Sequence, residues 1–154
     1  MEYTDKELRE KIAFLQEEIN IHIEKFSKKR KDNKYKARNF HVVITIASAI
    51  STVILGFDFA GFDAITFISN QTKNIALMIS SFITVISTYN TFFDHKSLWV
   101  NYTNTRNRLF DLRFDINFYL KGKEKIDPEE IEAFKERYRD ILHMLNEKWS
   151  KLRG

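Results

Sequence analysis

The sequence predicts an all-α protein, in which a two-helix transmembrane hairpin carries long cytoplasmic helices packed as a bundle. Residues 39–57 and 74–93 contain no Asp, Glu, Lys or Arg. As helices, these stretches span roughly 28–30 Å, which is the thickness of a bilayer core. Charged residues make up 30% of the chain and gather outside the two stretches. With 1 Pro and 4 Gly in 154 residues, helix breakers are few and the helices should be long.

Residues 1–38 are expected to form an N-terminal cytoplasmic helix that ends in a basic juxtamembrane segment. Thr4 and Glu7 have the spacing of a capping box, which marks the start of a helix. Spacings of four and three then alternate along one face, which indicates packing on another helix. That face carries Leu8, Ile12, Leu15, Ile19, His22 and Phe26. The positive residues before the first apolar stretch are Lys25, Lys28, Lys29, Arg30, Lys31, Lys34, Lys36 and Arg38.

Residues 39–94 are expected to form the transmembrane hairpin, with a connector from Asp58 to Asn74 on the outer side. Positive charge is concentrated before the first apolar stretch and after the second. The connector carries Asp58 and Asp63 against a single Lys73. By the positive-inside rule, both termini are therefore cytoplasmic. Aromatic residues in the connector favour a short amphipathic turn at the membrane interface.

Residues 95–154 are expected to form the C-terminal cytoplasmic helices. The first has a seam made of Leu98, Tyr102, Thr105, Leu109, Leu112, Ile116 and Tyr119, again with spacings of three and four. Gly122 lies where this helix should end. Asp127 and Pro128 then predict a new start, with Asp as N-cap and Pro at the first helical position. The stripe of the last helix is Ile131, Phe134, Tyr138, Ile141, Leu145, Trp149 and Leu152.

The two apolar stretches have a second interpretation, as buried core helices of a soluble bundle, because Ser and Thr dilute their apolar character. Their length and the asymmetric charges beside them favour the membrane. Ser81, Thr84 and Thr88 share one face of the second stretch. Such hydroxyl residues either allow close helix packing or, in an oligomer, line a pore. Because two spans cannot enclose a channel in a monomer, a pore requires a homo-oligomer.

The basic residues beside the hairpin also have two interpretations. They act as a topology signal and contact anionic lipid, which contributes about 1 kcal/mol per charge near the surface. Alternatively they bind a phosphate-bearing ligand. The candidate nucleotide contacts are Lys34, Arg38, Arg106 and Arg108.

Catalysis finds little support in the sequence. The chain has no Cys and 4 His, and the histidines have no metal-ligand spacing. No Gly-rich phosphate loop or nucleophile motif is present. We therefore expect no enzyme activity, no metal, no cofactor, and no DNA or RNA partner.

The residues after the second apolar stretch carry a family resemblance. Trp99, Tyr102, Thr105 and Leu109 form a W-x-x-Y-x-x-T-x-x-x-L pattern at the start of a long helix. Together with the basic juxtamembrane segment and the two spans, this pattern resembles the SLATT (also DUF4231) two-transmembrane effector domains of bacteria. The resemblance covers essentially the whole chain. The chain departs from that family at Thr103, where Arg is frequent, and at Asn107, where Glu is frequent.

The resemblance implies a membrane effector of a bacterial antiphage defence system linked to nucleotide second messengers. Such an effector oligomerises and permeabilises the inner membrane, and its signal is a cyclic or oligo-nucleotide made by a neighbouring enzyme. Trp99 and Tyr102 are then expected to couple the cytoplasmic helices to the second span. The alternative is a membrane scaffold without a pore, which recruits a cytoplasmic partner through its helical seams. A soluble helical adaptor is the third hypothesis.

Overall fold

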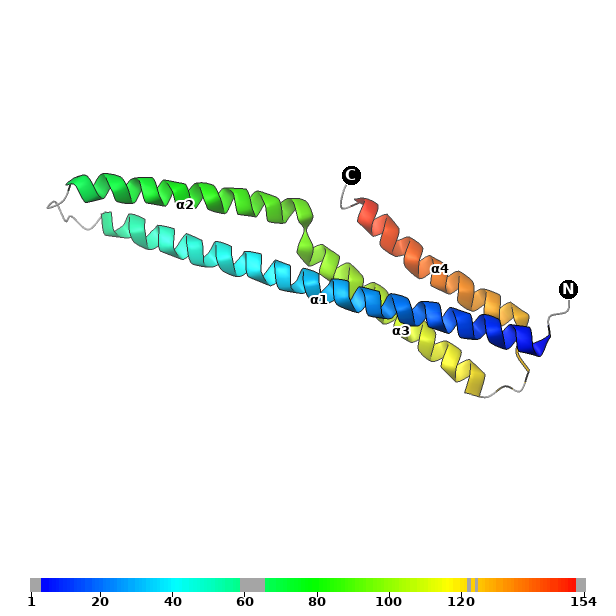
Figure 1. Cartoon of the computed structure of the whole chain (residues 1–154). Helices are drawn as coiled ribbons and strands as arrows, with labels where there is room; N and C mark the ends of the chain where they lie inside the picture. Colours follow the sequence, from blue (N-terminus) through cyan, green and yellow to red (C-terminus); the bar gives the residue numbers. More distant parts are fainter. Residues whose placement is uncertain (1–3, 59–65, 122, 124, 152–154) are drawn as a thin grey trace. The chain divides into compact units, whose positions relative to one another are not determined.

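The computed structural model describes residues 4–58, 66–121, 123 and 125–151. It contains four helices: α1 (Asp5–Asp58), α2 (Thr66–Phe93), α3 (His95–Lys121) and α4 (Pro128–Lys151) (Figure 1). No strand occurs in these residues, so the predicted all-α class is confirmed. The chain divides into two compact units. We call Met1–Asn33 with Lys96–Gly154 the bundle unit, and Lys34–His95 the hairpin unit.

The bundle unit is held together by the seams that the sequence predicts. One buried cluster joins the N-terminal part of α1 to α3 and α4. Its most buried side chains, Ile19, Leu109, Leu112 and Ile116, are 0% exposed. Burial of each such side chain stabilises the unit by about 1.5–3 kcal/mol. The seams therefore pack against one another within this unit, as the periodicity predicts.

The ends of the bundle helices follow the predicted capping signals. The Thr4 N–H donates to Glu7 Oε2 at 3.0 Å, which is the reciprocal half of a capping box. α3 ends at Lys121, directly before Gly122. At the start of α4, the Glu129 N–H donates to Asp127 Oδ1 at 3.0 Å. Asp127 is therefore the N-cap and Pro128 the first helical residue, as expected from the sequence.

We predict that Asp127→Ala lowers the free energy of unfolding by about 1 kcal/mol, because it leaves a helix N–H without its acceptor. Chemical denaturation of the detergent-solubilised chain, followed by circular dichroism, measures this loss. Asp127→Asn keeps an acceptor oxygen and should retain most of the stability. Equal losses in the two variants would contradict the capping role.

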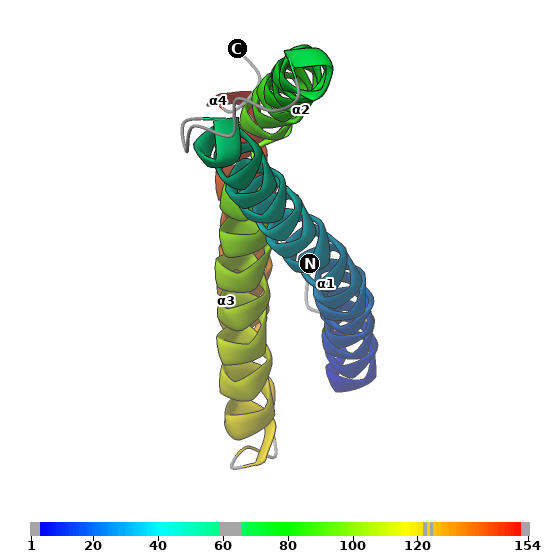
Figure 2. The same cartoon turned by 90° about the vertical axis from the view of Figure 1, so that its left-hand side faces the viewer.

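The hairpin unit consists of residues 34–58 of α1 and the whole of α2, which run antiparallel (Figure 1). In Figure 2 the C-terminal end of α1 and the N-terminal end of α2 face the viewer. Contact between them is made through small residues. Ser51 is 6% and Ala76 is 2% exposed, and Ser51 Oγ lies 3.4 Å from Ser80 Oγ. Small residues let two helices approach closely in a membrane.

The expected connector was too long. α2 begins at Thr66, so residues 66–73 belong to the helix and not to a turn between the spans. The reason is local, because no Gly or Pro lies between Thr66 and Asn74 to stop the helix. The rest of the expected connector, residues 59–65, lies outside the described residues.

A stack of rings closes the other end of the hairpin unit. The ring of His95, which is 7% exposed, stacks with those of Phe40 and Phe93, with centroids 5.7 and 5.9 Å away. Asp94 separates α2 from α3 and has a φ of 37°. A short polar side chain such as Asp tolerates this left-handed conformation. α2 therefore ends directly before Asp94, where the sequence predicts the exit from the second span.

Candidate functional site

The apolar parts of α1 and α2 are exposed, which is the observation that bears most on function. Each helix contains an 18-residue window apolar enough to cross a membrane, and only 6% of each window is buried. Core helices of a soluble bundle would bury one face of such windows. Exposed residues include Val53 in α1 and Met78 in α2, at 56% and 74%. Contiguous exposed apolar surface of this length fits contact with lipid.

The candidate pore-lining residues lie together on an exposed face of α2. Ser81, Thr84 and Thr88 are exposed. Each hydroxyl donates to the carbonyl of the residue four positions earlier, at 2.9, 3.0 and 2.9 Å. The hydroxyl hydrogens are thus satisfied within α2, while the oxygens remain able to accept hydrogen bonds from water. Because these hydrogens are already bonded, the face requires no partner helix. It can contact either lipid or a water-filled pore.

An open groove of about 450 Å³ lies beside two of these residues, in the C-terminal half of α2. Thr84 and Thr88 form part of its lining, together with Val85, Tyr89 and Phe92. Phe92 is 79% exposed. The surface next to the hydroxyl face is therefore strongly apolar and has room for another side chain or a lipid tail.

The family-motif residues are packing residues of the bundle unit. Tyr102, Thr105 and Leu109 are 3%, 6% and 0% exposed. The Tyr102 ring stacks on Phe26, with centroids 5.8 Å apart, and its hydroxyl accepts a hydrogen bond from Trp149 Nε1 at 3.0 Å. The motif therefore joins α3 to α1 and to α4. Sequence reasoning missed this contact with Trp149, because the two residues are 47 positions apart.

The remaining motif position, Trp99, and the two positions that depart from the family pattern make local hydrogen bonds. Trp99 is half-buried, and its carbonyl accepts the Thr103 hydroxyl at 2.8 Å. Asn107, the second departure from the family pattern, accepts from Arg106 Nη1 at 3.4 Å. The expected coupling of Trp99 and Tyr102 to the second span stays a prediction.

Two of the four candidate nucleotide contacts, Arg106 and Arg108, lie on different sides of α3. On α3, Arg106 Nε donates to Ser27 Oγ of α1 at 2.8 Å, whereas Arg108 Nη1 lies 2.6 Å from Met144 Sδ of α4. These two guanidinium groups thus point to opposite flanks of α3. Lys34 and Arg38 belong to the hairpin unit. The structure does not bring Arg106 and Arg108 into one site, and their nucleotide role stays a prediction.

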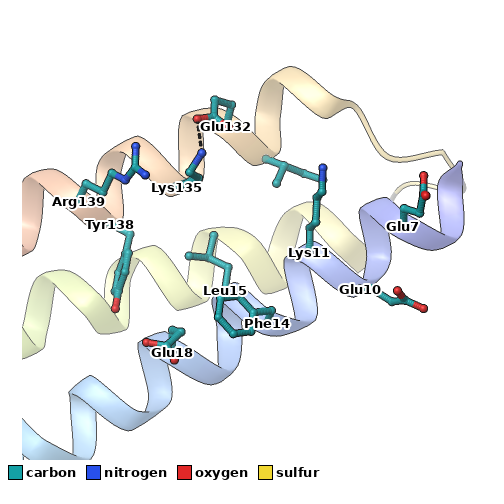
Figure 3. Close-up of a pocket in the computed structure, with 11 residues that line it drawn as sticks. Glu7, Glu10, Lys11, Phe14, Leu15, Glu18, Glu132, Lys135, Tyr138 and Arg139 are labelled. Atoms are coloured by element: carbon teal, nitrogen blue, oxygen red, sulfur yellow. Dashed lines mark hydrogen bonds and ion pairs between the residues drawn. The ribbon is translucent and has the colours of Figure 1, made fainter. Parts of the chain in front are cut away.

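A pocket of about 750 Å³ lies between α1 and α4 in the bundle unit and was not predicted from the sequence (Figure 3). Its lining mixes four Glu with Lys11, Lys135 and Arg139, and Lys135 Nζ pairs with Glu132 Oε1 at 2.6 Å. Phe14, 65% exposed, lies in its wall. The charges of this pocket are therefore largely balanced, which disfavours a strongly charged ligand.

Tyr138 links this pocket to the packing of α1 on α4. Its hydroxyl lies 2.9 Å from His22 Nδ1, which also lies 3.0 Å from the Glu18 carbonyl. Burial, and secondarily the Glu18 carboxylate, raises the pKa of Tyr138 above its usual value, so the phenol is neutral at physiological pH. His22 is thus a packing residue of the seam with a polar partner. Among the described residues, no group of three or more His, Asp and Glu is placed to hold a metal ion.

One family model matches the chain. It describes a family of proteins of unknown function, DUF4231, and covers residues 22–114. The match includes the basic juxtamembrane segment, both apolar stretches and the aromatic motif, but it ends before α4. It is therefore shorter than the whole-chain resemblance expected from the sequence. No curated protein and no solved structure matches the chain. Because the matched residues make up more than half of the 154-residue chain, the protein belongs to the DUF4231 family.

Proposed function

We propose that this protein is a membrane effector of a bacterial antiphage defence system. In this proposal the chain inserts in the inner membrane with both termini in the cytoplasm, assembles as a homo-oligomer, and permeabilises the membrane. Its assembly responds to a cyclic or oligo-nucleotide made by a neighbouring enzyme, sensed by the chain itself or by a partner. The proposal assigns no catalytic step to the chain.

The observation that carries the proposal is the exposure of the apolar windows in α1 and α2, of which only 6% is buried. Removing such surface from water is favourable by roughly 25 cal/mol per Å², so lipid is the expected environment. The distribution of basic residues on both sides of the hairpin supports cytoplasmic termini. The exposed hydroxyl face of α2 supports a wet axis in an assembly.

Induced expression in a bacterial host tests this proposal. We expect collapse of the membrane potential, reported by a voltage-sensitive dye, and leakage of a small dye from liposomes that contain the purified chain. Resistance of the protein to carbonate extraction confirms insertion in the same cells. An intact potential with the protein inserted, and dye-tight proteoliposomes, would contradict permeabilisation. A neighbouring gene for a nucleotide cyclase or nucleotidyltransferase would support the signalling link.

A second candidate function, a membrane scaffold without a pore, is favoured by two exposed aromatic residues in the bundle unit. Phe114 and Phe118 are 68% and 73% exposed and stack on each other with centroids 6.3 Å apart. Exposed aromatic residues are typical of protein–protein contacts. The scaffold predicts capture of a cytoplasmic partner that is lost in Phe114→Ser with Phe118→Ser, without ion leakage at any expression level.

A further inference from the structure

A second pocket of the bundle unit, about 310 Å³, has an unbalanced charge. It lies among α1, α3 and α4, and its lining includes Lys25, Lys29, Tyr102, Asn146 and Trp149. No carboxylate lines this pocket, in contrast to the four Glu of the pocket in Figure 3. Neither lysine has an ion-pair partner among the described residues. Two lysines thus line one small cavity that has no carboxylate in its lining.

The wall of this pocket offers a donor that the protein does not use. Tyr102 is 3% exposed, and its hydroxyl oxygen accepts from Trp149 Nε1 at 3.0 Å. The phenolic hydrogen has no acceptor within the part of the chain that the structure describes. A ligand oxygen in the pocket would accept this hydrogen.

The geometry of the wall is held in place by its neighbours. The Tyr102 ring lies on Phe26 with an interplanar angle of 21°, and Lys29 Nζ lies 5.5 Å from the centroid of the same ring. A cation over an aromatic face is attracted by the ring quadrupole. Lys29 is therefore kept at the pocket, and the Trp149 indole is oriented by its bond to Tyr102. The site is largely preformed, which lowers the entropic cost of binding.

We propose that this pocket binds a phosphate group. Lys25 and Lys29 supply the positive charge, the Tyr102 hydroxyl donates to a phosphate oxygen, and the Trp149 ring contacts the carbon atoms next to it. Lysine binds phosphate as a point charge, and hydrogen bonds to charged groups are about twice as strong as neutral ones. The phosphate belongs either to an anionic lipid headgroup or to a soluble phosphate compound. The site is separate from Lys34, Arg38, Arg106 and Arg108, and does not depend on permeabilisation.

Trp149 makes the proposal directly testable. The chain has 2 Trp, so the full chain with Trp99→Phe reports on the pocket through Trp149 emission alone. In one arm, protein in phosphatidylcholine nanodiscs is titrated with inorganic pyrophosphate. In the other arm, nanodiscs with a rising fraction of phosphatidylglycerol are compared without pyrophosphate. We expect a saturable change of emission in at least one arm, and the responding arm identifies the source of the phosphate.

Matched variants decide whether the response comes from this pocket. Lys25→Gln with Lys29→Gln should weaken binding by at least about tenfold, because both positive charges and their charge-assisted hydrogen bonds to the phosphate are lost. Lys25→Arg with Lys29→Arg keeps the charge and should retain binding. Lys11→Gln with Lys135→Gln, in the pocket of Figure 3, removes the same charge elsewhere and should change nothing. Circular dichroism verifies that all variants are folded. No response in either arm, or an equal loss in both Gln pairs, would overturn the proposal.

Discussion

Replacing Thr84 with arginine is expected to abolish leakage through the membrane while leaving insertion of the chain intact. Thr84 is exposed in the middle of residues 74–93 of α2, between Ser81 and Thr88 on the hydroxyl face. If this face surrounds a wet axis, each subunit of the oligomer would place a long charged side chain in the lumen. A single Arg at the centre of a span raises the free energy of insertion by about 2.5–3.5 kcal/mol, which an otherwise apolar span tolerates. Dye release from proteoliposomes measures the loss.

Two controls separate the pore from a general effect of the charge. Val85→Arg places the same group at an adjacent exposed position, 66% exposed, which points about 100° away around the helix. It should insert equally and keep leaking. Thr84→Val conserves volume and removes only the hydroxyl, so an open pore should remain. Unchanged leakage from Thr84→Arg would contradict the placement of Thr84 in the pore lining. An equal loss of leakage in both arginine variants would contradict the assignment of the pore lining to the hydroxyl face.

Leu109→Ala is expected to lower the free energy of unfolding of the bundle unit by about 3 kcal/mol. Leu109 is 0% exposed within the cluster that joins α1, α3 and α4. Truncation of a fully buried leucine costs about 2–5 kcal/mol, because it loses transfer free energy and leaves a cavity. Urea denaturation of the solubilised full chain in a Trp99→Phe background, followed by Trp149 fluorescence, reports on this unit because Trp149 is hydrogen-bonded to Tyr102.

Phe114→Ala on the same helix is the matched control. Phe114 is 68% exposed, and surface substitutions usually change stability by less than about 0.5 kcal/mol. A loss from Leu109→Ala no larger than that from Phe114→Ala would contradict the observed packing. The expected difference also defines the role of the family motif. Leu109 and Thr105 lie in the bundle core, so their substitution should affect activity through folding.

Local sequence signals predicted the helix ends well. The Thr4 and Glu7 capping box, the stop before Gly122 and the Asp127 N-cap are short-range interactions, and all three are present. The start of α2 at Thr66 was missed. There the aromatic composition of residues 58–74 indicated an interfacial turn, whereas the absence of a breaker after Thr66 decided the helix.

The candidate sites were harder to predict than the helices. The sequence identified Ser81, Thr84 and Thr88 as one face, and they share that face because helical spacing alone determines it. The pocket that we propose binds phosphate combines residues from α1, α3 and α4. A hydrogen bond between Tyr102 and Trp149 forms part of its wall. Periodicity could not predict this bond, because it indicates which residues share a helix face but not which faces pack together.

The sequence by itself determined the all-α class, the helix ends of the bundle unit, and two stretches long and apolar enough to span a membrane. These features depend on backbone hydrogen bonds, capping groups and hydrophobic length, which are local. Only the tertiary structure decided that the Tyr102 motif packs inside the bundle unit, that His95 stacks with two phenylalanine rings, and that two lysines line a cavity without a carboxylate. Those arrangements depend on contacts between residues that are distant in the sequence, and side-chain packing selects them only when the helices meet.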